Sequence, residues 1–132
     1  MTAPTNVPVL TQALAVAVGG GAGSLLRWRV GAWLNTLPWP LAAGTLAVNL
    51  VGGALIGFSL VAFERVPNEL LRLLLVTGGL GGLTTFSAFS AESLGLLIRG
   101  EYGVALLHTL AHVAGALAAA AIGWQIGRWV LA

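Results

Sequence analysis

Long stretches of this chain contain no charged residue at all. Its charged residues are six Arg and four Glu, and they leave the segments 30–63, 73–91 and 102–127 without charge. Because about 20 apolar residues in a helix cross the hydrocarbon core of a bilayer, each segment is long enough to span a membrane. With 58% hydrophobic and 8% charged residues, too few polar side chains remain to cover a water-soluble domain. The sequence therefore predicts an integral membrane protein.

Composition also excludes several classes of function. A net charge of +2 carried by so few groups offers no basic patch for nucleic acid. The absence of Cys excludes disulfides, thiolate chemistry and Cys-metal sites. No carboxylate pair, phosphate loop or nucleophile with a base is present, which argues against an enzyme. The first apolar run lacks a preceding basic segment, so we interpret it as a retained helix and not as a cleaved signal peptide.

The apolar segments predict an all-α fold with four transmembrane helices in a single domain, 1–132. The expected helices are 9–27, 41–63, 70–98 and 102–131. Pro38 and Pro40 mark the first connection, because Pro disfavours a continuing helix. Asn68 is the expected N-cap of the third helix, and Gly100 is expected to end it.

The Arg residues are divided evenly between the two sides of such a bundle. Three lie on the side of both termini and three on the other: Arg65, Arg72 and Arg128 against Arg27, Arg29 and Arg99. Since an excess of Lys and Arg in cytoplasmic loops normally sets orientation, this tie favours insertion in both orientations and an antiparallel dimer. The alternative is a single orientation set by another feature, such as the N-terminal amine or a partner.

Small residues spaced four apart allow helices to approach closely in lipid. Glycine pairs with this spacing are Gly19/Gly23, Gly53/Gly57, Gly78/Gly82 and Gly123/Gly127. They fit packing within the chain as well as packing between subunits.

Polar residues within the spans need a partner or an aqueous path, because hydrocarbon offers neither. Thr45 and Asn49 lie one turn apart on the second helix, and His108 and His112 lie one turn apart on the fourth. Two His at this spacing can bind a metal, but no carboxylate or Cys accompanies them nearby in the sequence. A hydrogen-bonding or pore-lining face is therefore favoured over a metal site.

The segment GGLGGLTTFSAFSAE at 78–92 is a poor helix interior, because Gly and Thr have low helix propensity. We expect the third helix to break within 78–85 at mid-membrane, where freed carbonyls can coordinate a cation and N–H groups can donate to an anion. Phe86 and Phe89 follow one turn apart, and their positive ring edges can face an anion. The alternative is that both rings face lipid or the core. Hydroxyl donors surround them at Thr85, Ser87 and Ser90.

Three segments together resemble the Fluc (CrcB) family of fluoride channels: 78–92, GTLAVNLVGG at 44–53 and GGGAGSLLRW at 19–28. The resemblance covers essentially the whole chain, and the T-T-F-S-x-F-S pattern is its most specific part. It implies a dual-topology antiparallel homodimer in the inner membrane, with two pores that export F⁻ passively and relieve fluoride toxicity. Some relatives work as paired inward and outward chains, so a heterodimer is an alternative that the even Arg split disfavours.

The resemblance also implies roles for individual residues. A structural Na⁺ at the dimer centre is expected on the backbone carbonyls of Gly81 and Thr84, and no organic cofactor is expected. The family's aromatic box maps to Phe86 and Phe89, and its pore-lining amide maps to Asn49.

Further positions map to the pathway and its entrances. Arg27 corresponds to the Arg of the vestibule. Glu92 is expected near a pore entrance, paired with an Arg of the other copy, because at depth a carboxylate would repel an anion. The polar track is expected to contain Ser90, Ser87 and Thr85.

The chain departs from the family pattern at three alanines where many members carry Ser or Thr: Ala88, Ala116 and Ala120. The two His residues of the fourth helix, His108 and His112, can substitute as donors. If they line the pore, conduction should change across roughly pH 5.5 to 7.5, near an ordinary imidazole pKa.

Two other classes share some of these features. A small multidrug-type proton-coupled exporter has four helices and dual topology, but its first helix needs a carboxylate, and none is present here. A non-transporting membrane subunit or assembly factor explains glycine-rich packing but not the T-T-F-S-A-F-S cluster.

Overall fold

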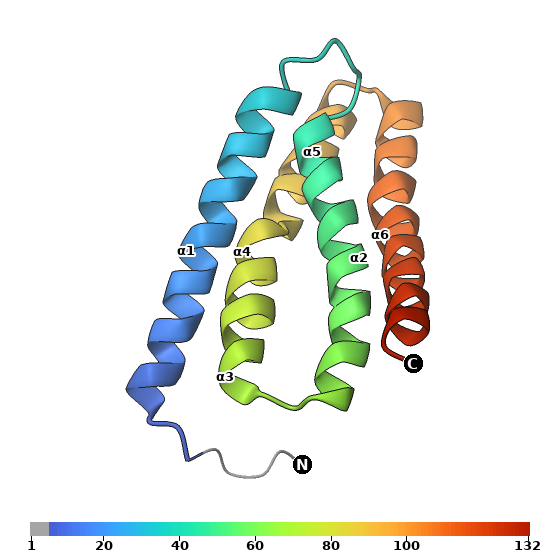
Figure 1. Ribbon diagram of the computed structural model, residues 1–132. Helices are drawn as coiled ribbons and strands as arrows, with labels where there is room; N and C mark the ends of the chain where they lie inside the picture. Colours follow the sequence, from blue (N-terminus) through green and yellow to red (C-terminus); the bar gives the residue numbers. More distant parts are fainter. Residues whose placement is uncertain (1–5) are drawn as a thin grey trace.

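The computed structural model describes residues 6–132, and every regular element in that range is a helix. Four helical spans are long and apolar enough to cross a membrane: Val9–Leu34, Ala43–Arg65, Glu69–Ile98 and Tyr102–Val130. They alternate in direction, so α1 (Val9–Leu34) begins at the end of the bundle where α6 (Tyr102–Val130) finishes (Figure 1). The protein is a multi-pass membrane protein.

The third span is built from four elements in series. It contains α3 (Glu69–Arg72), the π-helix η1 (Leu73–Leu80), α4 (Gly81–Leu83) and α5 (Phe86–Ile98). Between α4 and α5, Thr84 has φ −82° and ψ 156°, and Thr85 has φ −152° and ψ 115°, which are extended conformations. We expected the third helix to break within 78–85; in the structure 78–83 is helical, and only these two Thr leave the helix.

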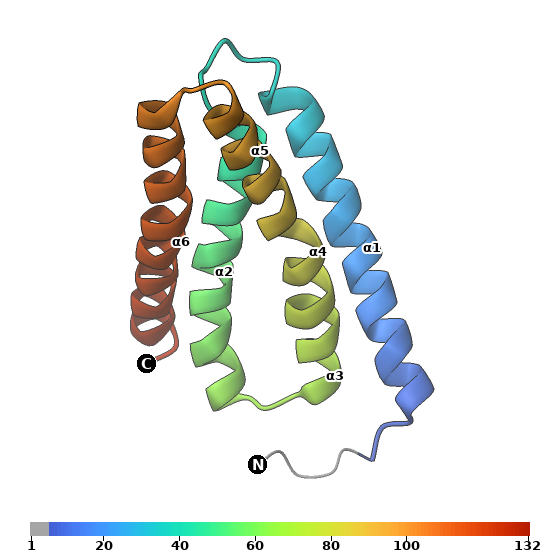
Figure 2. The same cartoon turned by 180° about the vertical axis from the view of Figure 1, so that it is seen from behind.

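Two helix pairs make up most of the packing. The second span, α2 (Ala43–Arg65), packs mainly against α6, whereas α1 packs against η1 and α4. Both views place α1 and α6 on opposite sides of the bundle (Figure 2). A Cβ atom on Gly23 would overlap the carbonyl oxygen of Gly79, and one on Gly57 would overlap that of Ala120. Glycine therefore permits backbone contact within the chain in both pairs.

The first helix extends further than the sequence indicated. We expected it to end at 27, but α1 continues to Leu34. Arg27 and Arg29 are good helix formers, and the next Pro after the start of the helix, Pro38, lies beyond its end. The Arg27 side chain stays inside the bundle, where its Nε donates to the Gly82 carbonyl at 2.9 Å.

Two helix ends form as predicted. The Asn68 side chain accepts a hydrogen bond from the Leu71 amide at 2.9 Å and caps α3, which confirms its N-cap role. Gly100 follows α5 with φ 75°, a left-handed conformation. The Gly100 amide donates to Leu97 at 3.0 Å and the Glu101 amide donates to Leu96 at 2.9 Å. These two bonds form a Schellman motif, which terminates the helix.

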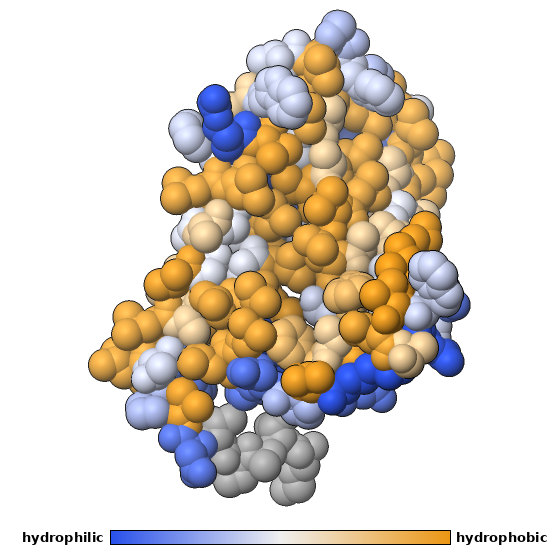
Figure 3. Space-filling model, viewed as in Figure 1, coloured by the Kyte–Doolittle hydropathy of each residue, from blue (hydrophilic) through white to orange (hydrophobic). Residues whose placement is uncertain are grey.

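The surface is apolar over the middle of the visible face, and hydrophilic side chains gather toward the two ends (Figure 3). Large apolar side chains are widely exposed, including Leu14, Leu106 and Leu117. In water such a surface would aggregate, but in a bilayer it faces lipid chains.

Candidate functional site

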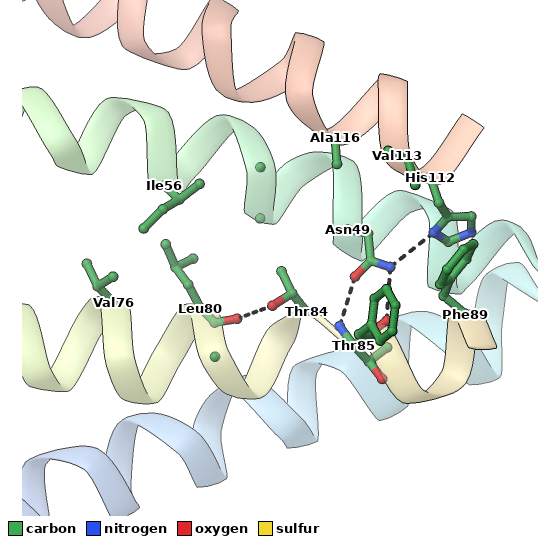
Figure 4. Close-up of a pocket in the computed structure, with 14 residues that line it drawn as sticks. Asn49, Ile56, Val76, Leu80, Thr84, Thr85, Phe89, His112, Val113 and Ala116 are labelled. Carbon is green, nitrogen blue, oxygen red and sulfur yellow. Dashed lines mark hydrogen bonds between the residues drawn. The ribbon is translucent and has the colours of Figure 1, made fainter. Parts of the chain in front are cut away.

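Asn49 of α2 lies at the centre of a hydrogen-bond network that reaches two other spans (Figure 4). Its side-chain oxygen accepts from the Thr85 amide at 2.8 Å, and its Nδ2 donates to the Thr85 carbonyl at 3.1 Å. The same Nδ2 lies 3.1 Å from Nδ1 of His112 on α6. Asn49 thus fixes the extended backbone between α4 and α5 and contacts the fourth span.

Thr85 also begins α5. Its hydroxyl accepts from the Ala88 amide at 3.1 Å, which is an N-cap, and it lies 3.1 Å from the Ser87 hydroxyl. The Ser90 hydroxyl donates to the Phe86 carbonyl of its own helix at 2.8 Å. Ser87 and Ser90 are exposed, and neither hydroxyl contacts Asn49 directly; Ser87 is joined to Asn49 only through Thr85.

The extended conformation at Thr84 and Thr85 also leaves two backbone carbonyls without the amides that would donate to them in a regular helix. In a regular helix the Gly81 carbonyl accepts from the amide of Thr85, and the Thr84 carbonyl accepts from that of Ala88. Here Thr85 donates to Asn49 and Ala88 donates to the Thr85 hydroxyl. The carbonyls of Gly81 and Thr84 therefore lose their usual helical donors.

An open groove of about 490 Å³ lies between α2 and the third span. One end is polar and contains Asn49, Thr84 and His112, and the remainder is apolar, with Ile56 and Leu80 facing each other across it (Figure 4). Phe86, Phe89, Gly81 and Ala116 line the same groove.

Four rings form a continuous cluster beside this polar end. Phe86 and Phe89 have centroids 5.3 Å apart, and Phe89 stacks on His108 at 5.3 Å with 7° between the planes. His112 lies 5.0 Å from Phe89 and 4.5 Å from His108. Phe86 is 77% exposed, whereas His108 and His112 are buried. The cluster therefore runs from the surface of the chain into its interior.

Glu92 of α5 contacts His108, the other member of the His pair. One oxygen accepts from the Thr45 hydroxyl at 2.6 Å, and the other lies 3.1 Å from Nε2 of His108. Nδ1 of His108 lies 3.0 Å from the Ser93 hydroxyl. No carboxylate lies near the two His in the sequence, but Glu92 lies near them in the structure. Helix packing brings α5 alongside α6, although 16 residues separate Glu92 from His108.

Glu92 is therefore bonded within its own chain by Thr45 and His108. It also lines a second cavity of about 450 Å³ together with Arg27, Ala88 and Asn35. No hydrogen bond joins Arg27 to Glu92 within residues 6–132, and the Nε of Arg27 donates to the Gly82 carbonyl.

Ser93 is the residue of this site that the sequence analysis missed. It lies one residue after Glu92 and two helical turns after Phe86, so the spacing of 86, 89 and 93 along one helix face could have indicated it. Ala120 lies outside both cavities, where its carbonyl packs against Gly57.

Comparison with known proteins agrees with this architecture. Residues 14–124 match the family described as CrcB-like protein, Camphor Resistance (CrcB). Two similar relatives are both named "Fluoride-specific ion channel FluC". The protein from Aromatoleum aromaticum is 50% identical over 126 residues, which cover 94% of each chain. The protein from Bordetella petrii is 50% identical over 112 residues, which cover 83% of this chain and 86% of the relative. The chain belongs to the CrcB family, a family of ion channels and not of enzymes.

Proposed function

We propose that this protein is a fluoride-specific channel that lets F⁻ leave the cell passively and thereby relieves fluoride toxicity. The relatives named as fluoride channels support the substrate. Within the structure, the proposal rests on a buried ring nitrogen beside the aromatic cluster that has no hydrogen-bond partner among the described residues. His112 is 4% exposed, and its Nε2 has no hydrogen-bond partner within residues 6–132.

The orientation of the Asn49 side chain decides whether Nε2 of His112 carries a proton. Because the Asn49 oxygen accepts from the Thr85 amide, its NH₂ group faces His112 Nδ1, which must accept. A neutral His112 then carries its proton on Nε2. That N–H is a buried donor of the kind that a small, strongly hydrated anion needs when it loses water. The edges of Phe86 and Phe89 supply further positive potential without holding the ion as a fixed charge would.

The proposed assembly is an antiparallel dual-topology homodimer with two pores, each lined by both copies. The open groove between α2 and the third span and the exposed ring of Phe86 support it, since a second copy would cover both. The even Arg distribution supports insertion in both orientations. In this assembly the Thr84–Thr85 interruption lies at mid-membrane.

The proposed structural Na⁺ is held at the dimer centre by the carbonyls of Gly81 and Thr84. The residues fit this ion, because both carbonyls have lost their usual helical donors and both residues line the open groove. Hard cations prefer such oxygen ligands. The ion would link two copies at their least regular backbone.

Fluoride transport is tested with purified protein in liposomes, by following passive efflux with a fluoride electrode and comparing chloride. We expect fast fluoride-selective efflux that Phe86→Ile abolishes. Phe63→Ile, the same exchange near the end of α2, serves as the control and should conduct normally. A folded dimer without fluoride efflux would reject the channel and favour proton-coupled export of a cationic substrate.

Topology is tested separately, because the chain has no Cys. Thr36→Cys and Pro67→Cys each place one thiol in a connection, at opposite ends of the bundle. With dual topology, an impermeant thiol reagent added to intact cells labels about half of each variant. Labelling of one variant alone would show a single orientation.

A further inference from the structure

Glu92, His108 and His112 offer ligand atoms that all lie within 4.8 Å of one another. We infer that these three residues form a site for a borderline divalent transition-metal cation such as Zn²⁺, and that the bound cation blocks fluoride passage. Carboxylate and imidazole are suitable zinc ligands, and two ligand atoms on one Zn²⁺ can be at most about 4.2 Å apart. A small side-chain movement therefore brings the three atoms into coordination distance.

Burial and accessibility fit such a site. His108 and His112 are 1% and 4% exposed, while the Glu92 side chain is 26% exposed and lines the cavity of about 450 Å³. A cation would enter through this cavity and meet the carboxylate first. Arg27 lines the same cavity and opposes a dication, which limits the affinity but does not remove the ligands.

The surroundings of His108 are already those of a metal ligand. Zinc on Nε2 would replace the hydrogen bond to Glu92 and place the ring proton on Nδ1. Ser93 lies 3.0 Å from Nδ1, and its hydroxyl can accept that proton. Such outer partners orient a ligating His and raise its basicity.

The partner of His112, in contrast to that of His108, opposes metal binding. Its Nε2 lacks a partner within residues 6–132, but its Nδ1 accepts from Asn49 in the metal-free chain. Zinc on Nε2 would move the proton to Nδ1, where it faces the Asn49 NH₂ group. Metal binding and the Asn49–His112 hydrogen bond therefore exclude each other. In Asn49→Asp a carboxylate oxygen would accept the Nδ1 proton of His112, although the hydrogen bond from the Asn49 NH₂ group to the Thr85 carbonyl would be lost.

A Zn²⁺ ion bound at this site would stop fluoride transport for two reasons. Both reasons rest on the proposed channel function. Coordination removes the free Nε2–H donor of His112. Three-ligand zinc sites also keep a fourth position open, where an anion such as F⁻ can bind and be retained. An ion held by a dication leaves slowly, which is incompatible with conduction.

The first test measures binding, because it does not depend on transport. Tag-free protein in detergent is titrated with ZnCl₂ in a calorimeter, without fluoride. The chain has two His and no Cys, so an imidazole site can lie only here. We expect one Zn²⁺ per chain, with binding lost in His108→Gln and in His112→Gln. Glu64→Gln, an exposed carboxylate elsewhere, serves as the matched control and should bind normally.

Two further variants test the outer partners. Ser93→Ala should weaken zinc binding about 10-fold, and Asn49→Asp should strengthen it by about the same factor. Zinc bound elsewhere would respond to neither. Absence of binding, or binding that survives His108→Gln in a folded variant, would overturn the inference.

The second test adds Zn²⁺ to liposomes during fluoride efflux and then removes it with EDTA. We expect reversible inhibition in the control Glu64→Gln as in the parent chain. If zinc binds but efflux continues unchanged, the blocking role is wrong. If no fluoride efflux occurs before zinc is added, the channel proposal fails while the binding result stands.

Discussion

Asn49 holds the backbone of Thr85, 36 residues away, by a hydrogen bond to its amide at 2.8 Å and another to its carbonyl at 3.1 Å. A side-chain amide can pair with a peptide in this way because it has a donor and an acceptor side by side. The amide and the carbonyl of Thr85 are therefore paired inside an apolar bundle, where water cannot replace their missing helical partners.

Removing this contact should destabilise the fold. Asn49→Leu keeps the approximate volume but leaves both backbone groups of Thr85 and Nδ1 of His112 without that partner. An unsatisfied buried polar group costs about 1–3 kcal/mol, so we expect at least about 2 kcal/mol of lost stability. The measurement is thermal unfolding of the protein in detergent. Ser59→Ala, which removes an exposed hydroxyl from the same helix, should leave the midpoint unchanged.

Replacing Thr85 tests the cap and the cation together. Thr85→Val keeps the shape but removes the hydroxyl that accepts from Ala88, which should cost about 1 kcal/mol. The freed Ala88 amide can return to the Thr84 carbonyl and compete with Na⁺. We therefore expect Thr85→Val to lose any stabilisation by Na⁺ over N-methylglucamine in thermal unfolding, while Thr85→Ser retains it. An identical Na⁺ response in both variants would show that stabilisation by Na⁺ does not depend on the Thr85 cap.

Close helix packing should make Gly23 intolerant of a methyl group. In Gly23→Ala the new Cβ meets the backbone of Gly79 and Leu83, which cannot move aside as a flexible side chain would. Overpacking of this kind costs about 1–3 kcal/mol. Gly21→Ala is the matched control, because nothing lies within 4 Å of its Cβ position. Equal unfolding midpoints for the two variants would contradict the α1–η1 packing.

Gly100 and Gly103 should respond to alanine with opposite signs. Nothing lies within 4 Å of a Cβ at either position, but Gly100 has φ 75°. An L-residue in this left-handed conformation costs about 1–2 kcal/mol. Gly103 lies in the first turn of α6, where alanine should stabilise by up to about 1 kcal/mol. Thermal unfolding of Gly100→Ala and Gly103→Ala in parallel would check both values. If alanine destabilised the protein at both positions, backbone conformation would not explain the effects.

Local features of the sequence determined much of the architecture. Long apolar segments predicted the four spans, because hydrocarbon selects long apolar helices. The Asn68 cap and the glycine turn at Gly100 were also readable, since each depends on a few neighbouring residues. Family membership followed from the motif at 78–92 and is confirmed by the match over residues 14–124.

Contacts between spans could be decided only by the tertiary structure. The sequence showed Asn49, Thr85 and the His pair as separate polar positions, but nothing in their spacing joined Asn49 to Thr85 or Glu92 to His108. The same holds for Arg27, whose side chain finds its acceptor on Gly82 of the third span. A buried polar group in a membrane must find a partner, and the sequence states this need. Which distant residue meets it depends on how closely the glycine-rich helices pack and at what rotation.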